Sequence, residues 1–175
     1  ALFVVLLVDI VVPSSALAIV AAAAAALLQF VRVTRWQGWK MADEPIVWVL
    51  HVGYLWIAVA LALKALWLAF GFPFAAYWMH ALTAGAFGTM ILGVMSRVAL
   101  GHTGRPLVVA PSIAIAYVLV SLGAAMRVFV AALMPAHYLT CVAIGGLLWI
   151  AAFLIFAAVY APILVTPRVD AAPAA

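Results

Sequence analysis

Long apolar stretches, each close to membrane length and separated by short turn-forming segments, constrain the fold of this chain more than any other feature. Hydrophobic residues make up 72% of the sequence and charged residues 7%. A helix crosses a bilayer with about 20 mostly apolar residues, whereas a spanning strand alternates polar and apolar positions. Stretches such as residues 16–28 show no alternation. The sequence therefore predicts an all-α membrane protein, a polytopic bundle of transmembrane helices.

Proline and glycine divide the chain into five full spans within one bundle of residues 13–167. The expected spans are residues 15–33, 45–70, 74–99, 107–134 and 138–161. We expect Pro162 to stop the last span. Residues 1–12 are helical in character but about half the length that spanning requires, so we interpret them as a truncated transmembrane helix of a longer protein. Residues 168–175 are expected to form a cytoplasmic tail.

The distribution of basic residues predicts the orientation. The turns near Pro13, Gly71 and Pro135 contain no Lys or Arg, whereas the alternate helix ends carry Arg32, Arg35, Lys40, Arg97, Arg105 and Arg168. Basic loops face the cytoplasm, so the C-terminus is expected there. The pI of about 9.7 then reflects topology, and we expect no nucleic-acid partner. The tryptophans near the helix ends are interpreted as interfacial belt residues, namely Trp36, Trp39, Trp48 and Trp78.

Ionisable residues inside the spans are the candidates for function, because charge at membrane depth is costly. His80, Lys64 and Arg127 are expected about 9 Å inside the helix ends that lack basic residues, at 1.5 Å per residue. His51 is expected near the opposite, basic end. Counting the rise per residue separates His51 from His80 by roughly 20 Å along the membrane normal, so the two do not share one metal. Lys64 is expected to snorkel to the headgroups.

Three histidines are candidate metal ligands, since neutral imidazole is the commonest protein ligand for haem iron and copper. They are His80, His51 and His102. The alternative is that each histidine bonds a backbone carbonyl or bridges two helices. Small residues near Arg127 (Gly123, Ala124 and Ala125) favour an inward-facing arginine, which requires an anion.

The loop GHTGRP at residues 101–106 has two interpretations. Its glycines beside basic side chains allow a phosphate-binding nest, although it is not a Walker A motif because GK[ST] is absent. The alternative is a basic turn that fixes topology, and His102 is also a candidate to cap a site at the basic end with His51. The sequence shows no Ser-His-Asp arrangement, cysteine pair or carboxylate pair, which argues against hydrolytic chemistry.

Several strings resemble the C-terminal part of the NnrS family, bacterial inner-membrane proteins that carry haem and copper and act in the response to nitric oxide. The strings are RVTRWQGWK (32–40), LHVGYLW (50–56), HALTAGAFGTMILGVMSR (80–97), LGHTGRPL (100–107) and YAPILVTPRVD (160–170). The resemblance implies a haem b and copper as cofactors, nitric oxide as a small-molecule partner, and N-terminal helices of the same protein as packing partners. Gln29 stands where many members are expected to carry histidine.

Combining residues and resemblance, we expect a haem and copper membrane protein that protects against nitric oxide by binding or reducing it. The expected cofactor-binding residues are His80, His51 and Arg127, with Arg127 facing a haem propionate or an anion from the missing helices. The expected metal ligands are His80, His51 and His102. Two alternatives remain open: a b-type electron-transfer cytochrome subunit, and a cofactor-free transporter or membrane assembly scaffold.

Overall fold

The computed structural model describes residues 1–13 and 15–169, and all regular structure in these residues is helical. The α-helices are α1 (Leu2–Val11), α2 (Ala16–Arg35), α3 (Pro45–Phe70), α4 (Trp78–His80), α5 (Gly88–His102), α6 (Pro111–Ala125), α7 (Ala131–Leu133) and α8 (Tyr138–Val165). Short 3₁₀ segments cover Gly38–Met41, Pro73–Tyr77 and Pro135–His137. Two π-helical segments, Ala81–Phe87 and Met126–Val130, join α4 to α5 and α6 to α7.

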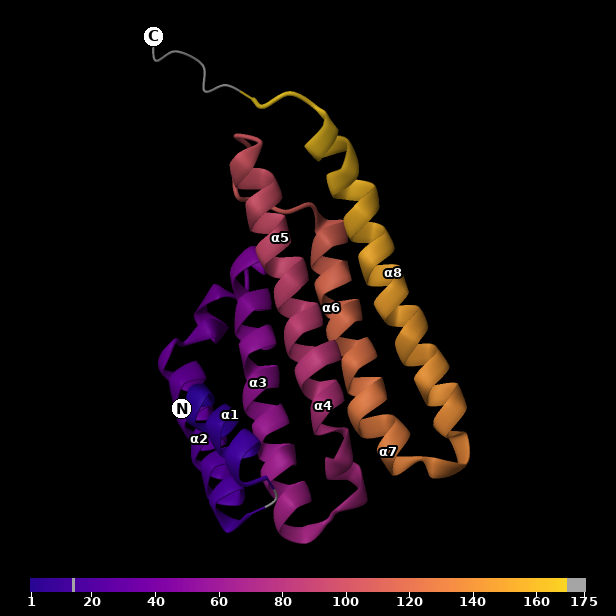
Figure 1. Cartoon of the computed structure of the whole chain (residues 1–175). Coiled ribbons are helices and arrows are strands. Elements are labelled where there is room, and N and C mark those ends of the chain that lie inside the picture. Colours follow the sequence, from indigo (N-terminus) through magenta and orange to yellow (C-terminus); the bar gives the residue numbers. More distant parts are fainter. Residues whose placement is uncertain (14, 170–175) are drawn as a thin grey trace.

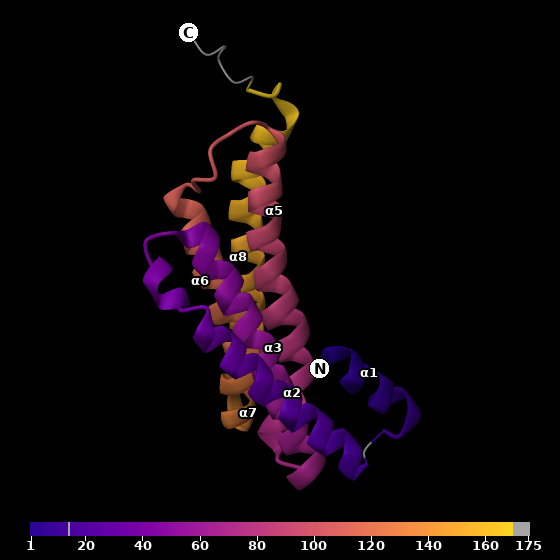
Figure 2. The same ribbon diagram turned by 90° about the vertical axis from the view of Figure 1, so that its left-hand side faces the viewer.

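Five continuous helical stretches in the described residues are long and apolar enough to cross a membrane, which confirms the predicted fold class. They are Ala16–Arg35, Pro45–Phe70, Pro73–His102, Pro111–Leu133 and Pro135–Val165. Figure 1 shows them side by side as one bundle, with α3 and the α4–α5 stretch in the middle. The short helix α1 lies to one side and packs on α2, as Figure 2 shows from the neighbouring direction.

Consecutive long helices run in opposite directions, so their connections gather at two ends of the bundle (Figure 1). The α2–α3 and α5–α6 connections and the end of α8 lie toward one end, which we call the basic end. It carries Arg32, Arg35, Lys40, Arg97, Arg105 and Arg168. The α1–α2, α3–α4 and α7–α8 connections lie toward the other, which we call the plain end.

Several helix ends differ from the sequence-based expectation: α2 continues to Arg35 and α5 to His102, beyond the expected ends at residues 33 and 99. Helix α8 continues through Pro162 to Val165. Transmembrane helices tolerate such a proline where neighbouring groups compensate for the lost hydrogen bond. After α5, the chain stays irregular until Pro111, although the next span was expected from residue 107. Proline suits the first helical turn because its missing N–H has no intrahelical partner there, so Pro111 is the natural start of α6.

Lys64 does not snorkel. Its side chain is 8% exposed and forms an ion pair with Asp9 of α1. Its ammonium nitrogen also lies 4.7 Å from the ring centre of Trp78. The interpretation of Lys64 as a lipid-facing residue is therefore wrong, because a carboxylate and an aromatic face within the protein replace the headgroup region as surroundings for its charge.

Small residues allow α6 and α8 to approach closely. A Cβ on Gly123 would lie 2.8 Å from the carbonyl oxygen of Gly145, and a Cβ on Gly145 would lie 2.9 Å from that of Gly123. In lipid, helix association depends on such packing and on interhelical hydrogen bonds rather than on hydrophobic burial. This contact places Arg127, one turn beyond Gly123, beside α8.

Candidate functional site

His51 lies in α3 near the basic end, and its hydrogen bond defines its tautomer. The ring nitrogen Nδ1 lies 3.0 Å from the carbonyl oxygen of Val47, one turn earlier in the same helix. A carbonyl oxygen only accepts, so Nδ1 carries a proton, and in the neutral imidazole Nε2 is then the nitrogen with the lone pair. Histidines that ligate metals almost always donate their second ring N–H in this way. The Nδ1 contact of His51 is thus the one that a histidine ligating a metal through Nε2 commonly makes.

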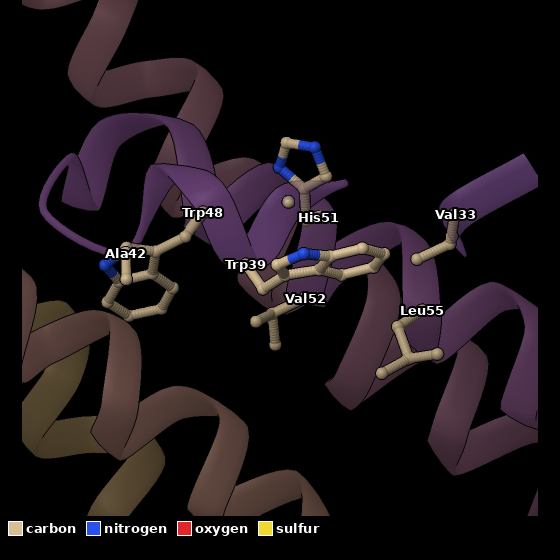
Figure 3. Close-up of a pocket in the computed structure, with 8 residues that line it drawn as sticks. Val33, Trp39, Ala42, Trp48, His51, Val52 and Leu55 are labelled. Carbon is tan, nitrogen blue, oxygen red and sulfur yellow. The ribbon is translucent and has the colours of Figure 1, made fainter. Parts of the chain in front are cut away.

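A pocket of about 410 Å³ adjoins His51. Figure 3 shows the imidazole beside the indole of Trp39, with Trp48 and Ala42 on one side and Val33 and Leu55 on the other. The lining is almost entirely apolar. Ligand pockets typically combine such walls with a few placed polar groups, and here the polar group is the imidazole.

Gly38 makes room for the imidazole. A Cβ at this position would lie 2.6 Å from Cδ2 and 3.1 Å from Nε2 of His51, closer than real side chains approach. The preceding residue, Gln37, has a φ of 52°. This left-handed conformation, uncommon outside glycine, ends α2 and directs the Gly38–Met41 segment toward α3. The turn at Gln37 brings the Gly38–Met41 segment to α3, and the lack of a side chain on Gly38 leaves room for the imidazole of His51.

An aromatic and polar cluster surrounds the other side of His51. The rings of Trp36 and His51 meet edge to face with centroids 5.7 Å apart, and the Trp36 and Tyr54 rings lie 4.7 Å apart. Tyr54 donates a hydrogen bond of 2.5 Å to Oε1 of Gln29, which is 5% exposed. The guanidinium of Arg32 lies 5.4 Å from the Trp36 ring. Gln29, the position where the NnrS resemblance suggests histidine, therefore faces the helix that carries His51.

His80 and Arg127 meet near the plain end. A guanidinium nitrogen of Arg127 lies 3.0 Å from Nε2 of His80. Arginine only donates, so Nε2 accepts and its lone pair is engaged. His80 directly precedes the π-helical segment Ala81–Phe87, and Arg127 belongs to the segment Met126–Val130. Single π turns occur frequently at functional sites because they displace side chains from the regular helical register.

A groove of about 460 Å³ adjoins this pair. It is bounded by the α4–α5 stretch, by α6 with the π-helical turn that follows it, and by α8. Its glycine-rich side contains Gly123, Gly145 and Gly146, and Trp149 lies at its edge. The indole nitrogen of Trp149 is buried and has no hydrogen-bond partner among the described residues.

The structure does not bring His102 and His51 to one pocket. His102 is exposed at the end of α5 and lines a separate shallow hollow with Arg97, Gly101 and Leu107. The loop after it is fastened to the end of α8. Arg105 donates a 3.0 Å bond to the Thr166 hydroxyl, and the Val169 N–H donates to the Thr103 carbonyl. These contacts favour the interpretation of the GHTGRP loop as a basic turn over that of a phosphate-binding nest, because they join the end of α5 to the end of α8.

The donor groups of the described residues bear on the two expected cofactors. Across residues 1–13 and 15–169, no three His, Cys, Asp or Glu side chains gather closely enough to hold a metal ion. A haem ligand requires a histidine with an available ring nitrogen and an apolar surface nearby; the hydrogen bond of His51 uses Nδ1 and not Nε2, and the side chain lines an apolar pocket.

Sequence reasoning missed the role of several neighbours. Trp48, Val52 and Leu55 line the pocket with His51, yet Trp48 and Trp39 were interpreted as belt residues. The spacing contained a usable signal, because positions 48, 51, 52 and 55 follow the i, i+3, i+4, i+7 pattern of one helix face. Gly38 and Trp149 offered no such signal, since their importance depends on contacts between separate helices.

Comparison with known proteins gives one match. The model of the NnrS family, described as NnrS protein, matches residues 1–168. No curated protein and no solved structure matches the chain. Because the family model covers nearly all of the sequence, the chain belongs to the NnrS family.

Proposed function

We propose that this chain holds a haem through His51 and takes part in protection against nitric oxide, by binding or reducing it. The observation that carries the proposal is the hydrogen bond from Nδ1 of His51 to Val47, which leaves Nε2 for a ligand, in a side chain that lines an apolar, aromatic pocket. The haem iron, when bound, supplies a coordination position for nitric oxide. The chain itself would ligate the iron through His51 and orient the imidazole through its bond to Val47. The apolar walls of the pocket would exclude water.

Charge near the pocket supports the same assignment. Arg32 lies over the Trp36 ring beside His51, Arg35 is the last residue of α2, and Lys40 lies in the connection between α2 and α3. These cations match the carboxylates that a haem carries. The sequence pointed to Arg127 as a propionate partner, but Arg127 lies near the plain end, toward the opposite end of the bundle from this pocket.

Location follows from the charge pattern. We propose that the protein resides in the bacterial inner membrane with the basic end and the C-terminus in the cytoplasm, because basic loops are retained there. A cysteine placed at Gly71, with the buried Cys141 replaced by alanine, should react with an impermeant reagent from outside the cell. Reaction from the cytoplasmic side alone would invert this topology.

Optical spectra of the purified full-length protein test the function. A haem gives a Soret band, and nitric oxide added to the reduced protein should shift that band. A Soret band without a response to nitric oxide would favour the b-type electron-transfer cytochrome. Absence of both haem and metal would exclude the two redox functions together.

A cofactor-free scaffold is the second candidate, and one observation favours it. His80 is engaged by Arg127 across helices, which is how a histidine behaves when it bridges a bundle rather than ligates a metal. Under this alternative His51 serves packing only, and replacing it leaves the spectrum of the full-length protein unchanged.

A further inference from the structure

We propose that a groove between α3 and α6 admits nitric oxide from the membrane interior to the pocket that His51 lines. This groove, called the α3–α6 groove below, has a volume of about 460 Å³ and is bounded by one face of α3, by α6 and by the π-helical turn after α6. The route rests on the proposed function, since it leads to the pocket assigned to the haem.

The α3–α6 groove adjoins the His51 pocket along one face of α3. Trp48, Val52 and Leu55 line both cavities, and Figure 3 shows these three side chains beside His51. The boundary that the two cavities share therefore consists of side chains of a single helix. Leu55 is 38% exposed, and exposed side chains change rotamer within picoseconds to nanoseconds. A small gas would pass this boundary by side-chain motion alone.

The lining of the α3–α6 groove suits a small guest of low polarity. None of the described residues that line it is charged. The hydroxyl of Ser121 is already paired with that of Thr89, 3.2 Å away. Trp56 and Phe129 stack in its wall with ring centres 6.0 Å apart. Apolar spaces of this kind stay free of water and take up guests such as benzene or xenon, and nitric oxide is likewise uncharged, small and weakly polar.

The α3–α6 groove also faces lipid and reaches the middle of the span. On α3 its lining runs from Trp48 to Val59, or about 16 Å at 1.5 Å per residue. Val59 lies near the midpoint of α3. Two of its lining residues on α6, Val118 and Leu122, are 47% and 50% exposed. Nitric oxide dissolved in the bilayer would therefore enter sideways, at membrane depth, without crossing the loops at either end.

The first experiment measures gas entry by flash photolysis of carbon monoxide, a diatomic gas of similar size and low polarity, from the reduced full-length protein in nanodiscs. The double variant Val118→Phe with Ala125→Phe adds two rings to the groove wall. We expect its bimolecular rebinding rate to fall roughly tenfold, which corresponds to a barrier about 1.4 kcal/mol higher. Phe129→Ala, which removes a ring from the wall, should raise the rate. The Soret absorbance per protein should stay normal in all variants.

The matched control is Val94→Phe. Val94 of α5 is 44% exposed, close to the value for Val118, but it does not line the α3–α6 groove. This variant should rebind carbon monoxide at the wild-type rate.

The second experiment needs no haem. The full-length protein is labelled with 5-fluorotryptophan and titrated with xenon, and the fluorine resonance of Trp56 is assigned with Trp56→Phe. Trp56 is 8% exposed and lines the groove. We expect a saturable shift of this resonance in the wild type and in Val94→Phe, and a much smaller shift in the double variant.

The outcomes separate this route from the proposed function. Equal rebinding rates in the double variant and in Val94→Phe, with haem bound, would overturn the route and leave the proposed function intact. A Trp56 resonance that does not respond to xenon, as when a lipid acyl chain fills the groove, would also overturn it. A missing Soret band would remove the proposed function, and the xenon titration would then still decide whether the groove takes up an apolar gas.

Discussion

His51 and His80 are both intramembrane histidines, yet the structure engages their ring nitrogens in opposite ways. His51 donates from Nδ1 to its own helix, at Val47, and keeps Nε2 free beside an aromatic pocket. His80 accepts at Nε2 from Arg127, a residue of another helix. The same kind of side chain therefore leaves Nε2 out of its hydrogen bond near one end of the bundle and bridges two helices through Nε2 near the other. The two histidines differ in which ring nitrogen forms the hydrogen bond, Nδ1 in His51 and Nε2 in His80. How deeply each residue is buried does not distinguish them.

The contrast extends to the surroundings of each histidine. At the plain end, polar side chains are paired across helices: Arg127 with His80, and Lys64 with Asp9. At the basic end, His51 is satisfied within its own helix and lies beside tryptophans and Gly38, while the cross-helix hydrogen bond of the same cluster joins Tyr54 to Gln29 and leaves His51 out. Cross-helix pairs hold a bundle together, whereas a self-satisfied histidine leaves a nitrogen for a ligand. The following predictions test this difference, from the largest expected effect to the smallest.

Replacing His51 should have the largest effect. His51→Phe keeps an aromatic ring but removes the coordinating nitrogen, so we expect the full-length protein to insert normally and to lose nearly all haem. The Soret absorbance per protein measures this. His102→Phe is the matched control, because His102 is exposed and lines a different hollow. A normal Soret band in His51→Phe would remove the basic-end pocket from consideration as the haem site.

Breaking the Lys64–Asp9 pair should cost the most stability. Lys64→Met leaves the Asp9 carboxylate without its cation, and removing one partner of a buried ion pair costs about 3 kcal/mol. Denaturant-induced unfolding in detergent micelles measures the change. The double variant Asp9→Asn with Lys64→Met should regain most of the loss, because no uncompensated charge remains. Wild-type stability in Lys64→Met would show that this pair does not hold the plain end together.

Crowding the contact between α6 and α8 tests how the plain end is built. Gly145→Leu places a side chain against the carbonyl oxygen of Gly123, and overpacking of this kind costs about 2 kcal/mol. Its control is Gly146→Ala at the neighbouring position, where an added Cβ meets no atom within 4 Å. Equal unfolding free energies for the two variants would argue against the close glycine contact.

Replacing His80 should have the smallest effect. His80→Phe removes one interhelical hydrogen bond, and such bonds contribute about 0.6 kcal/mol in membrane bundles. A double-mutant cycle with Arg127→Gln measures the coupling energy directly. Haem content should stay normal. Loss of haem in His80→Phe would break the comparison with His51, because both histidines would then be ligands and Arg127 would have to release Nε2.

Composition and turn residues were sufficient to predict the fold class. Runs of apolar residues without alternation permit only helices in lipid, because each backbone group must be bonded within its own segment. Prolines and glycines then marked most helix ends, with Pro45 as a clear example. The prediction that Pro162 stops the last span was wrong, because α8 continues through this residue to Val165. Whether a transmembrane helix can contain a proline depends on the groups of neighbouring helices, which the local sequence does not show.

The sequence by itself determined that this protein is a helical membrane bundle of the NnrS type with a few costly polar residues at two depths. It also singled out His51, His80, His102 and Arg127. Only the tertiary structure decided their pairings. Gly38 lies against His51, Arg127 bonds His80, and Asp9 neutralises Lys64. The physical reason is that spacing along one helix fixes which residues share a face, whereas partners on different helices depend on rotation and close approach, which glycine contacts such as Gly123 with Gly145 set.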